Sequence, residues 1–220
     1  MINIALDGPA GSGKSTVAKI LSKELDILYL DTGAMYRACG LKCVKLGVSV
    51  KDENAVSVFI NDLDLKIDYK NGAQVTILDG IDVSTEIRKP EVSMLASDVS
   101  ALKCVRLKMV EMQRKIASSM DCVLDGRDIG SFVLPNANYK YFVTADSFVR
   151  AQRRFKELIE RGTPVESLDA LHEEIKQRDY NDSHREFAPL KQADDAVLVD
   201  TTDMSIEEVV NFILSDLRSR

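Results

Sequence analysis

Residues 8–15 read Gly8-Pro9-Ala10-Gly11-Ser12-Gly13-Lys14-Ser15, and Thr16 follows them. This order fits G-x-x-x-x-G-K-[ST], the pattern of a loop that holds nucleotide phosphates. The pattern also needs a strand before the loop and a helix after it. An apolar run at 2–6 precedes the loop, and apolar residues recur after it at helical spacing, at Val17, Ile20, Leu21 and Leu25. We therefore predict a strand, a glycine loop and a helix over the first 25 residues.

The small residues of this loop have a physical purpose. Glycines let the backbone curl so that its N–H groups point inward at an anion. The N-terminus of the following helix adds free N–H donors and the positive end of the helix dipole. In this arrangement Lys14 is predicted to reach the β- and γ-phosphates, and the hydroxyl of Ser15 to hold Mg²⁺.

Composition narrows the class of protein. The chain has 220 residues, of which 45% are apolar, and its formal net charge is −6. This length suits one α/β domain with insertions. The negative charge argues against a surface that binds nucleic acid or an anionic membrane, so any anion site is expected to be local. No stretch reads as a signal peptide or a membrane span, and we expect a cytoplasmic protein. The four cysteines lack zinc or C-x-x-C spacing and are expected to be free thiols.

Strands that alternate with helices predict a parallel sheet. Short apolar runs place further strands at residues 27–30, 121–125, 140–145 and 196–200. The first of these leads to a helix from about 34 to 46, which is expected to stop at Gly47. Ligands of such sheets bind beyond the carboxyl ends of the strands. The expected functional edge therefore includes Asp31, Thr32, Tyr36 and Arg37.

Residues 63–83 break this alternation. Apolar and polar residues alternate on both sides of Asn71-Gly72, which suits a two-residue hairpin turn, and Asp79-Gly80 suits a second turn. The segment is therefore predicted to be a small antiparallel β insert. A helical region is predicted to follow it, from Pro90 to about Ser119.

Residues 146–190 are predicted to be helical and are rich in arginine. Gly162-Thr163-Pro164 divides them into two arms. We interpret Arg150 and Arg161 as solvated charges on this helix pair. The two histidines of the chain, His172 and His184, lie in the same polar region and are expected to be surface residues. Farther along, Ser205 and Glu208 form a capping box that opens the last helix.

The strand at 121–125 is expected to deliver Asp125 and the residues after it to the edge that holds the glycine loop. Asp125 can orient Mg²⁺ or its water shell there. Several arginines are expected at this edge, and their guanidinium groups match phosphates in a bidentate manner. An acidic protein that gathers them suggests a closed site for two phosphorylated ligands. These arginines are Arg37, Arg127, Arg153, Arg154, Arg178 and Arg185.

Four motifs, in this order, make the chain similar to the bacterial cytidylate kinases, which are nucleoside monophosphate kinases of the P-loop NTPase class. The motifs are Gly8 to Thr16, Asp31-Thr32-Gly33-Ala34-Met35-Tyr36-Arg37, Asp125-Gly126-Arg127-Asp128-Ile129-Gly130, and Ile175-Lys176-Gln177-Arg178-Asp179 through Arg185 to Ala188-Pro189-Leu190. The resemblance spans nearly the whole chain, including the β insert. One departure is Thr32, where the family usually has serine, and the hydroxyl is retained.

The resemblance implies an α/β fold: a P-loop NTPase core with a five-stranded parallel sheet flanked by helices, a small antiparallel β insert and a helical lid. It implies one domain over 1–220. The core would comprise 1–31, 120–145 and 191–220, the region that binds the monophosphate 32–119, and the lid about 146–190. The implied reaction is Mg²⁺-assisted, in-line phosphoryl transfer from ATP to CMP or dCMP, which gives ADP and CDP or dCDP. A monomer is implied, with neither a nucleic-acid polymer nor a membrane as partner.

The resemblance also assigns roles to single residues. ATP would be bound by Gly8 to Thr16 with Arg153 and Arg154. CMP would be bound by Thr32, Tyr36, Arg37, Ser97, Arg106, Arg127, Asp128, Arg178, Asp182 and Arg185. The catalytic residues would be Lys14, Arg37, Arg127 and Arg153, and Mg²⁺ would be held by Ser15 and Asp125, through water. Ser97, Arg106 and Asp128 match the residues that read cytosine. A carboxylate can accept a hydrogen bond from cytosine N4, whereas it repels O4 of uracil.

Two alternatives stay open. A monophosphate kinase with another acceptor, such as UMP/CMP, differs at the base readers Asp128 and Arg106. A phosphate-loop switch is the alternative that is not primarily an enzyme, but the N-K-x-D motif of a GTPase switch is not found. Single residues have simpler explanations as well. Asp31 suits a helix cap, Arg106 and Ser97 suit an exposed helix face, and Asp128 suits an ion pair with Arg127.

Overall fold

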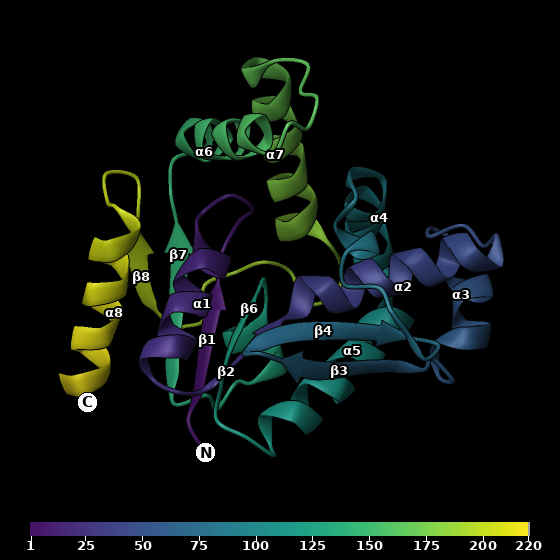
Figure 1. Ribbon diagram of the computed structural model, residues 1–220, viewed down its shortest axis with the longest axis horizontal. Coiled ribbons are helices and arrows are strands. Elements are labelled where there is room, and N and C mark those ends of the chain that lie inside the picture. Colours follow the sequence, from purple (N-terminus) through teal and green to yellow (C-terminus); the bar gives the residue numbers. More distant parts are fainter. Residues whose placement is uncertain (220) are drawn as a thin grey trace. The chain divides into compact units, whose positions relative to one another are not determined.

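The computed structural model describes residues 1–219 (Figure 1). Its larger sheet has five strands in the order β2-β6-β1-β7-β8. These are β1 (Asn3–Asp7), β2 (Leu28–Asp31), β6 (Cys122–Gly126), β7 (Tyr139–Thr144) and β8 (Val197–Asp200). β7 pairs in parallel with both β1 and β8, so that Leu6 lies opposite Tyr141 and Val143 opposite Val199. The predicted fold class is confirmed: a parallel sheet with flanking helices and a separate three-stranded antiparallel sheet.

The chain divides into two compact units. The first comprises Ile27–Leu124 with Met1, and the second comprises Ile2–Asp26 and the chain from Asp125 onward. No helix within residues 1–219 combines the length and the apolar character that crossing a bilayer requires.

In the second unit, the central strand β1 leads through the glycine loop into α1 (Lys14–Glu24). Ile4, Ala5 and Leu6 are fully buried, as expected for a parallel strand that is covered on both faces. The last helix, α8 (Ile206–Ser219), packs against α1. The predicted capping box opens α8. The N–H and Oγ of Ser205 each donate to Glu208 at 2.8 Å, and the N–H of Glu208 donates to the Ser205 hydroxyl at 3.2 Å.

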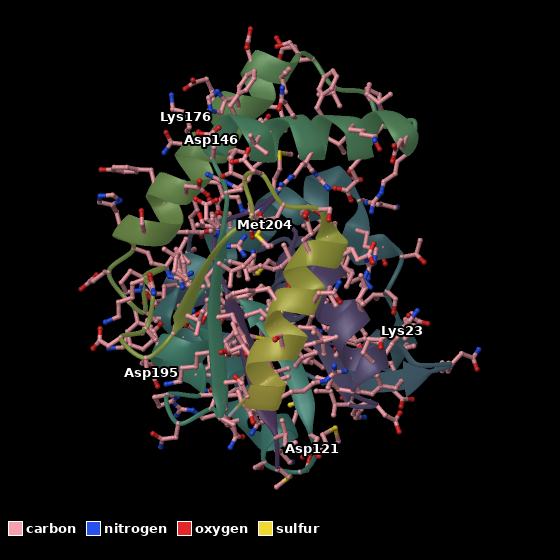
Figure 2. All side chains as sticks on the ribbon, turned by 90° about the vertical axis from the view of Figure 1, so that its left-hand side faces the viewer. Lys23, Asp121, Asp146, Lys176, Asp195 and Met204 are labelled. Atoms are coloured by element: carbon pink, nitrogen blue, oxygen red, sulfur yellow. The ribbon has the colours of Figure 1, made fainter. Side chains whose placement is uncertain are left out.

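The arginine-rich segment of the second unit forms α6 (Ser147–Glu160) and α7 (Leu168–His184), which lie side by side (Figure 1). Ala151, Leu171 and Ile175 form the buried apolar centre of this pair. Asp146, labelled in Figure 2, caps α6 by accepting hydrogen bonds from two backbone N–H groups of its first turn. The two helices are divided at residues 162–164, as the sequence predicts.

One histidine departs from its expected place. His172 is half-buried, its Nε2 lies 2.9 Å from the Ser147 hydroxyl, and its ring contacts Phe148 edge-on. The expectation that His172 is an incidental surface residue is therefore wrong, because it joins α7 to the start of α6. His184 is exposed, as expected, and stacks on Tyr180.

The first unit holds most of the remaining helices. They are α2 (Thr32–Leu46), α3 (Glu53–Ile60), η1 (Glu86–Arg88), α4 (Pro90–Ala101) and α5 (Lys103–Ala117), while η2 (Ile129–Val133) belongs to the second unit. α2 ends at Gly47, whose positive φ of 67° matches the predicted stop. The helical region after Pro90 is two helices rather than one, since Leu102 adopts an extended backbone between them.

The β insert is confirmed as a three-stranded antiparallel sheet of β3 (Leu65–Lys70), β4 (Ala73–Leu78) and β5 (Ile81–Asp82). Asn71 and Gly72 both have positive φ, as a type I′ hairpin turn requires. Two hydrogen bonds join the insert to β2. The Tyr69 hydroxyl donates to the Tyr29 carbonyl at 3.1 Å, and the N–H of Asp31 donates to the Gln74 side chain at 2.8 Å. The insert therefore supports the strand end that precedes α2.

Candidate active site

The phosphate loop depends on glycine at its first position. Gly8 has a φ of 143°, and a Cβ there would lie 2.0 Å from the carbonyl oxygen of Val143 in β7. No other residue type fits against this strand without displacing it. At the other end of the loop, Gly13 adopts a φ of 87° and starts α1 without a side-chain cap. The first N–H groups of α1 are thus left for a ligand.

Lys14 is buried and folds back over its own loop. Its Nζ donates to the Pro9 carbonyl at 2.7 Å and contacts the Ser12 hydroxyl at 3.3 Å. Burial, and after it the nearby charge of Arg127, lower the pKa of Lys14 to about 7, although Asp125 acts in the opposite direction. Arg127 and Arg178 therefore both lie close enough to act on the charge of Lys14. An anion at this point would stabilise the protonated lysine.

Ser15 and Asp125 meet beside the loop, as their predicted positions imply. The Ser15 hydroxyl donates to Oδ2 of Asp125 at 2.5 Å. A hydroxyl and a carboxylate are oxygen donors of the kind that Mg²⁺ prefers. Within residues 1–219, no cluster of three or more acidic, histidine or cysteine side chains could hold a metal by itself. The pair fits the usual Mg²⁺ arrangement at such loops, where one or two protein groups share the ion with water and substrate phosphates.

Two ion pairs gather the predicted acceptor residues of the second unit. Nε of Arg127 donates to Oδ2 of Asp182 at 2.8 Å, and Arg185 lies 3.4 Å from Asp128. Burial alone would raise the pKa of Asp182, but Arg127 and Arg178 more than offset this effect and hold the pKa below its usual value. Asp182 thus remains a carboxylate that orients Arg127.

In the first unit, Asp31 is bonded on both oxygens. One accepts from the Ala34 N–H at 2.9 Å, and the other pairs with Arg37 at 2.8 Å. The helix-cap explanation of Asp31 is therefore confirmed, and the same carboxylate also positions Arg37. Thr32 begins α2 and is buried.

Arg106 is only 1% exposed, which contradicts the explanation of it as a surface charge. Its guanidinium lies 5.4 Å from the centre of the Tyr36 ring and donates to the Ser100 carbonyl at 3.2 Å. This cation–π contact brings Arg106 and Tyr36, two residues of the predicted CMP set, together. Ser97 is half-buried on α4, and its carbonyl accepts from the Ser100 hydroxyl.

The two predicted lid arginines of α6 have different partners. Arg153 donates to the hydroxyl and the carbonyl of Thr201, at 2.9 and 2.5 Å, and approaches the Met204 carbonyl at 3.5 Å. Figure 2 labels Met204 in the loop between β8 and α8. Arg154 forms a half-exposed ion pair with Glu157. Their roles toward ATP stay predictions.

Two buried charged residues were not recognised from the sequence. Arg150, expected to be solvated, is 5% exposed, so that interpretation is wrong. Its partners come from residues 10, 145 and 179, and no local pattern indicates them. Asp7 accepts hydrogen bonds from the N–H groups of Ile129 and Gly130, both at 2.7 Å. Asp7 could have been recognised from the sequence, because it is a carboxylate at the end of an apolar strand directly before the loop.

Asp7 gives a prediction about stability and pH. Burial raises the pKa of Asp7 from 3.8 to about 7. The folded protein then holds a proton that the unfolded chain releases between these pH values, so this group makes the free energy of unfolding fall as pH rises from about 4 to 7. Asp7→Asn is expected to remove this dependence and to cost about 2 kcal/mol at pH 5, because an amide nitrogen cannot accept from a backbone N–H.

Urea unfolding of both proteins at pH 5 and pH 7.5 measures this effect. The stability gap between wild type and Asp7→Asn should shrink at the higher pH. Asp194→Asn changes an exposed carboxylate and serves as the control. A gap that stays constant or widens would show that folding does not raise the pKa of Asp7.

Known proteins resemble this chain over nearly its whole length. A sequence profile of the family described as cytidylate kinase matches residues 4–219. The cytidylate kinase of Caldicellulosiruptor bescii is 50% identical over 213 residues, which are 97% of this chain and 94% of the relative. The cytidylate kinase of Clostridioides difficile is 49% identical over 214 residues, 97% of each chain.

A solved structure from Eubacterium ventriosum, described only as an uncharacterized protein, matches over 100% of both chains with a TM-score of 0.55 and 14% identity. This likeness concerns the fold alone. The sequence matches, by contrast, cover nearly the full length and include the phosphate loop, so this protein is a kinase, an enzyme that transfers a phosphoryl group. The chain belongs to the cytidylate kinase family.

Proposed function

We propose that this enzyme transfers the γ-phosphoryl group of ATP to CMP and dCMP, with Mg²⁺ as the metal ion. The observation that carries the proposal is the cationic centre at Lys14. Its pKa falls to about 7 because it is buried and because Arg127 lies close by, with Arg178 adding to the effect. Lys14 belongs to the donor phosphate loop, whereas Arg127 and Arg178 belong to the predicted acceptor set. A phosphate on each side would neutralise these charges at the point of transfer.

The acceptor base is proposed to be read by Asp128. This carboxylate is 4% exposed and lies near Arg185, so a base that meets it must offer a donor. Cytosine offers N4–H, and uracil offers an acceptor at the same position. The burial of Arg106 supports a second reading contact rather than a surface role. The other acceptor residues stay as the resemblance assigns them, namely Thr32, Tyr36, Arg37, Ser97, Arg178, Asp182 and Arg185.

The residues of the chain perform the transfer by alignment and charge neutralisation. A nucleotide monophosphate is already mostly dianionic near neutral pH, so no general base is needed. Lys14, Arg127, Arg37 and Arg153 would stabilise the charge on the transferring group. Ser15 and Asp125 would hold Mg²⁺ through water, and the ion when bound supplies further charge neutralisation on the donor phosphates. We assign residues 32–119 to acceptor binding and residues 146–190 to a lid that excludes water.

The proposal predicts a strong dependence on the acceptor. With MgATP, ADP should form rapidly with CMP and dCMP, and about 100-fold more slowly with UMP, because the buried carboxylate of Asp128 would face a uracil oxygen. The measurement is ADP release with CMP, dCMP, UMP, AMP, GMP and no acceptor. Equal rates with UMP would establish the UMP/CMP alternative. ADP release that is indifferent to the acceptor would contradict the kinase proposal for these substrates.

Asp128→Asn sharpens the assignment. The amide can offer either a donor or an acceptor, so kcat/KM for CMP should fall, while kcat/KM for UMP should fall less or rise. The ratio of kcat/KM for CMP to that for UMP should therefore drop by at least about 10-fold. Asp121→Asn, at the other end of β6 and labelled in Figure 2, is the matched control and should leave the preference unchanged. An unchanged CMP-to-UMP ratio in Asp128→Asn would remove its role as base reader.

A further inference from the structure

Arg150 joins three separate segments of the second unit through one guanidinium group. It lies in the first turn of α6 and is 5% exposed. Its Nε donates to the Ala145 carbonyl at 2.9 Å, and its Nη1 donates to the Ala10 carbonyl at 3.0 Å. Nη1 also lies 2.7 Å from Oδ2 of Asp179 on α7. The end of β7, the phosphate loop and α7 are therefore held at a single side chain.

The phosphate loop also packs directly on this residue. A Cβ added at Gly11 would lie 3.1 Å from Cβ of Arg150 and 3.2 Å from its carbonyl oxygen. The contact is tight because glycine leaves space there. The backbone of the loop and the start of α6 consequently move together or clash.

The bond to Ala10 has a directional consequence for ligand binding. The Ala10 carbonyl and the Gly11 N–H belong to one peptide unit, and no peptide bond in the described chain is cis. In a trans peptide the C=O and N–H groups point in opposite directions. Arg150 therefore turns the Gly11 N–H away from itself. When a phosphate accepts from that N–H, the peptide is polarised and its carbonyl becomes a better acceptor for Arg150.

The bond to Asp179 extends this link to α7. Asp179 follows Arg178 directly and lies one helical turn before Asp182, so it shares a helix segment with two residues that we assign to the acceptor. The donor atoms of a guanidinium are fixed in one plane. A movement of the phosphate loop at Ala10 is therefore passed through Arg150 to Asp179. A buried arginine with a carboxylate partner is also costly to separate, which keeps the connection intact.

We propose that Arg150 is a positioning residue that couples occupancy of the phosphate loop to the placement of Arg178 and Asp182. Donor binding thereby raises the affinity for the acceptor, and acceptor binding raises the affinity for the donor by the same factor. Arg150 touches neither substrate in this scheme. The inference rests on the proposed function, because it takes ATP as the donor ligand and CMP as the acceptor.

The test is the affinity for CMP, measured by titration calorimetry with and without a non-hydrolysable ATP analogue and Mg²⁺. In the wild-type protein the analogue should tighten CMP binding about 10-fold, within the usual range of such couplings. In Arg150→Met this factor should fall close to one. Arg150→Lys should retain only part of it, since an ammonium lacks the planar fork. Asp179→Asn should lower the same factor, and adding it to Arg150→Met should cause little further loss.

Arg161→Met is the matched control, because Arg161 caps the C-terminal end of α6 and its side chain forms an exposed ion pair with Glu157. It should keep the full coupling. Coupling that stays at the wild-type value in folded Arg150→Met would overturn the inference, and so would a wild-type protein whose two ligands bind independently. If Arg150→Met does not fold, Asp179→Asn decides between the same outcomes. Failure of the proposed function looks different, because the wild-type protein would then not release ADP in response to CMP.

Discussion

Lys14→Met is expected to lower kcat by a factor on the order of 1,000, the size of effect seen when a charge-stabilising donor is removed at a reacting centre. The side chain is buried at the phosphate loop and is the one that the loop pattern directs to the β- and γ-phosphates. Methionine has similar length and no charge, so folding should survive. The measurement is steady-state ADP release at saturating MgATP and CMP.

Lys23→Met provides the control. Lys23 lies on the same helix, α1, and is exposed (Figure 2). Its substitution should leave kcat unchanged. A Lys14→Met enzyme that retains more than about a tenth of the wild-type kcat would contradict the assignment of Lys14 to transition-state stabilisation.

The lowered pKa of Lys14 adds a second readout. Its folded-state pKa of about 7 lies below the usual lysine value of 10.5. Between these pH values the unfolded chain holds a proton that the folded chain lacks, so the ligand-free protein gains stability from this group as pH rises. ATP phosphates should restore the higher pKa. At pH 8, ATP binding is therefore expected to take up a proton, which calorimetry in two buffers of different ionisation enthalpy detects. Lys14→Met should lose this uptake.

Gly8→Ala is expected to destabilise the fold by about 4 kcal/mol, from backbone strain and overpacking together. The φ of 143° suits only glycine, and the added Cβ would lie 2.0 Å from a backbone oxygen of β7, an interior strand of the sheet. A strand in the middle of a sheet has little freedom to retreat. The measurement is the free energy of unfolding in urea.

Gly72→Ala separates the two causes of this effect. Gly72 also has a positive φ, 74°, but no atom lies within 4 Å of the position that its Cβ would take. That change should cost only about 1 kcal/mol, from backbone strain alone. If Gly8→Ala costs no more than Gly72→Ala, the close approach to Val143 does not constrain the loop.

Much of the fold could be predicted because the signals are local. The phosphate loop, the Asn71-Gly72 hairpin and the Ser205–Glu208 capping box each depend on residues within a few positions of one another. The neighbouring positions of Ser15 and Asp125 could also be predicted, because Ser15 comes shortly after one strand of the parallel sheet and Asp125 lies at the carboxyl end of another.

Other features depend on residues that are far apart in the chain. α3 was not predicted, and the break at Leu102 was missed because its neighbours on both sides are helix formers. His172 was assigned to the surface, although Ser147 and Phe148 of another helix cover it. In each case tertiary contacts outweighed the local preference.

The sequence by itself determined that this chain forms a parallel α/β sheet with a phosphate loop and belongs with kinases of cytidylate type, because spacing and residue type suffice for those conclusions. Only the tertiary structure decided which charges are buried and which partners they have. From the sequence, Arg150 resembles any other solvated arginine, and only the structure shows that it bonds residues 10 and 179. Asp7 likewise resembles an ordinary strand end, and only the structure shows that the N–H groups of residues 129 and 130 donate to it. Segments that are distant in sequence bury a charge and supply its partners, so the local sequence pattern does not indicate either.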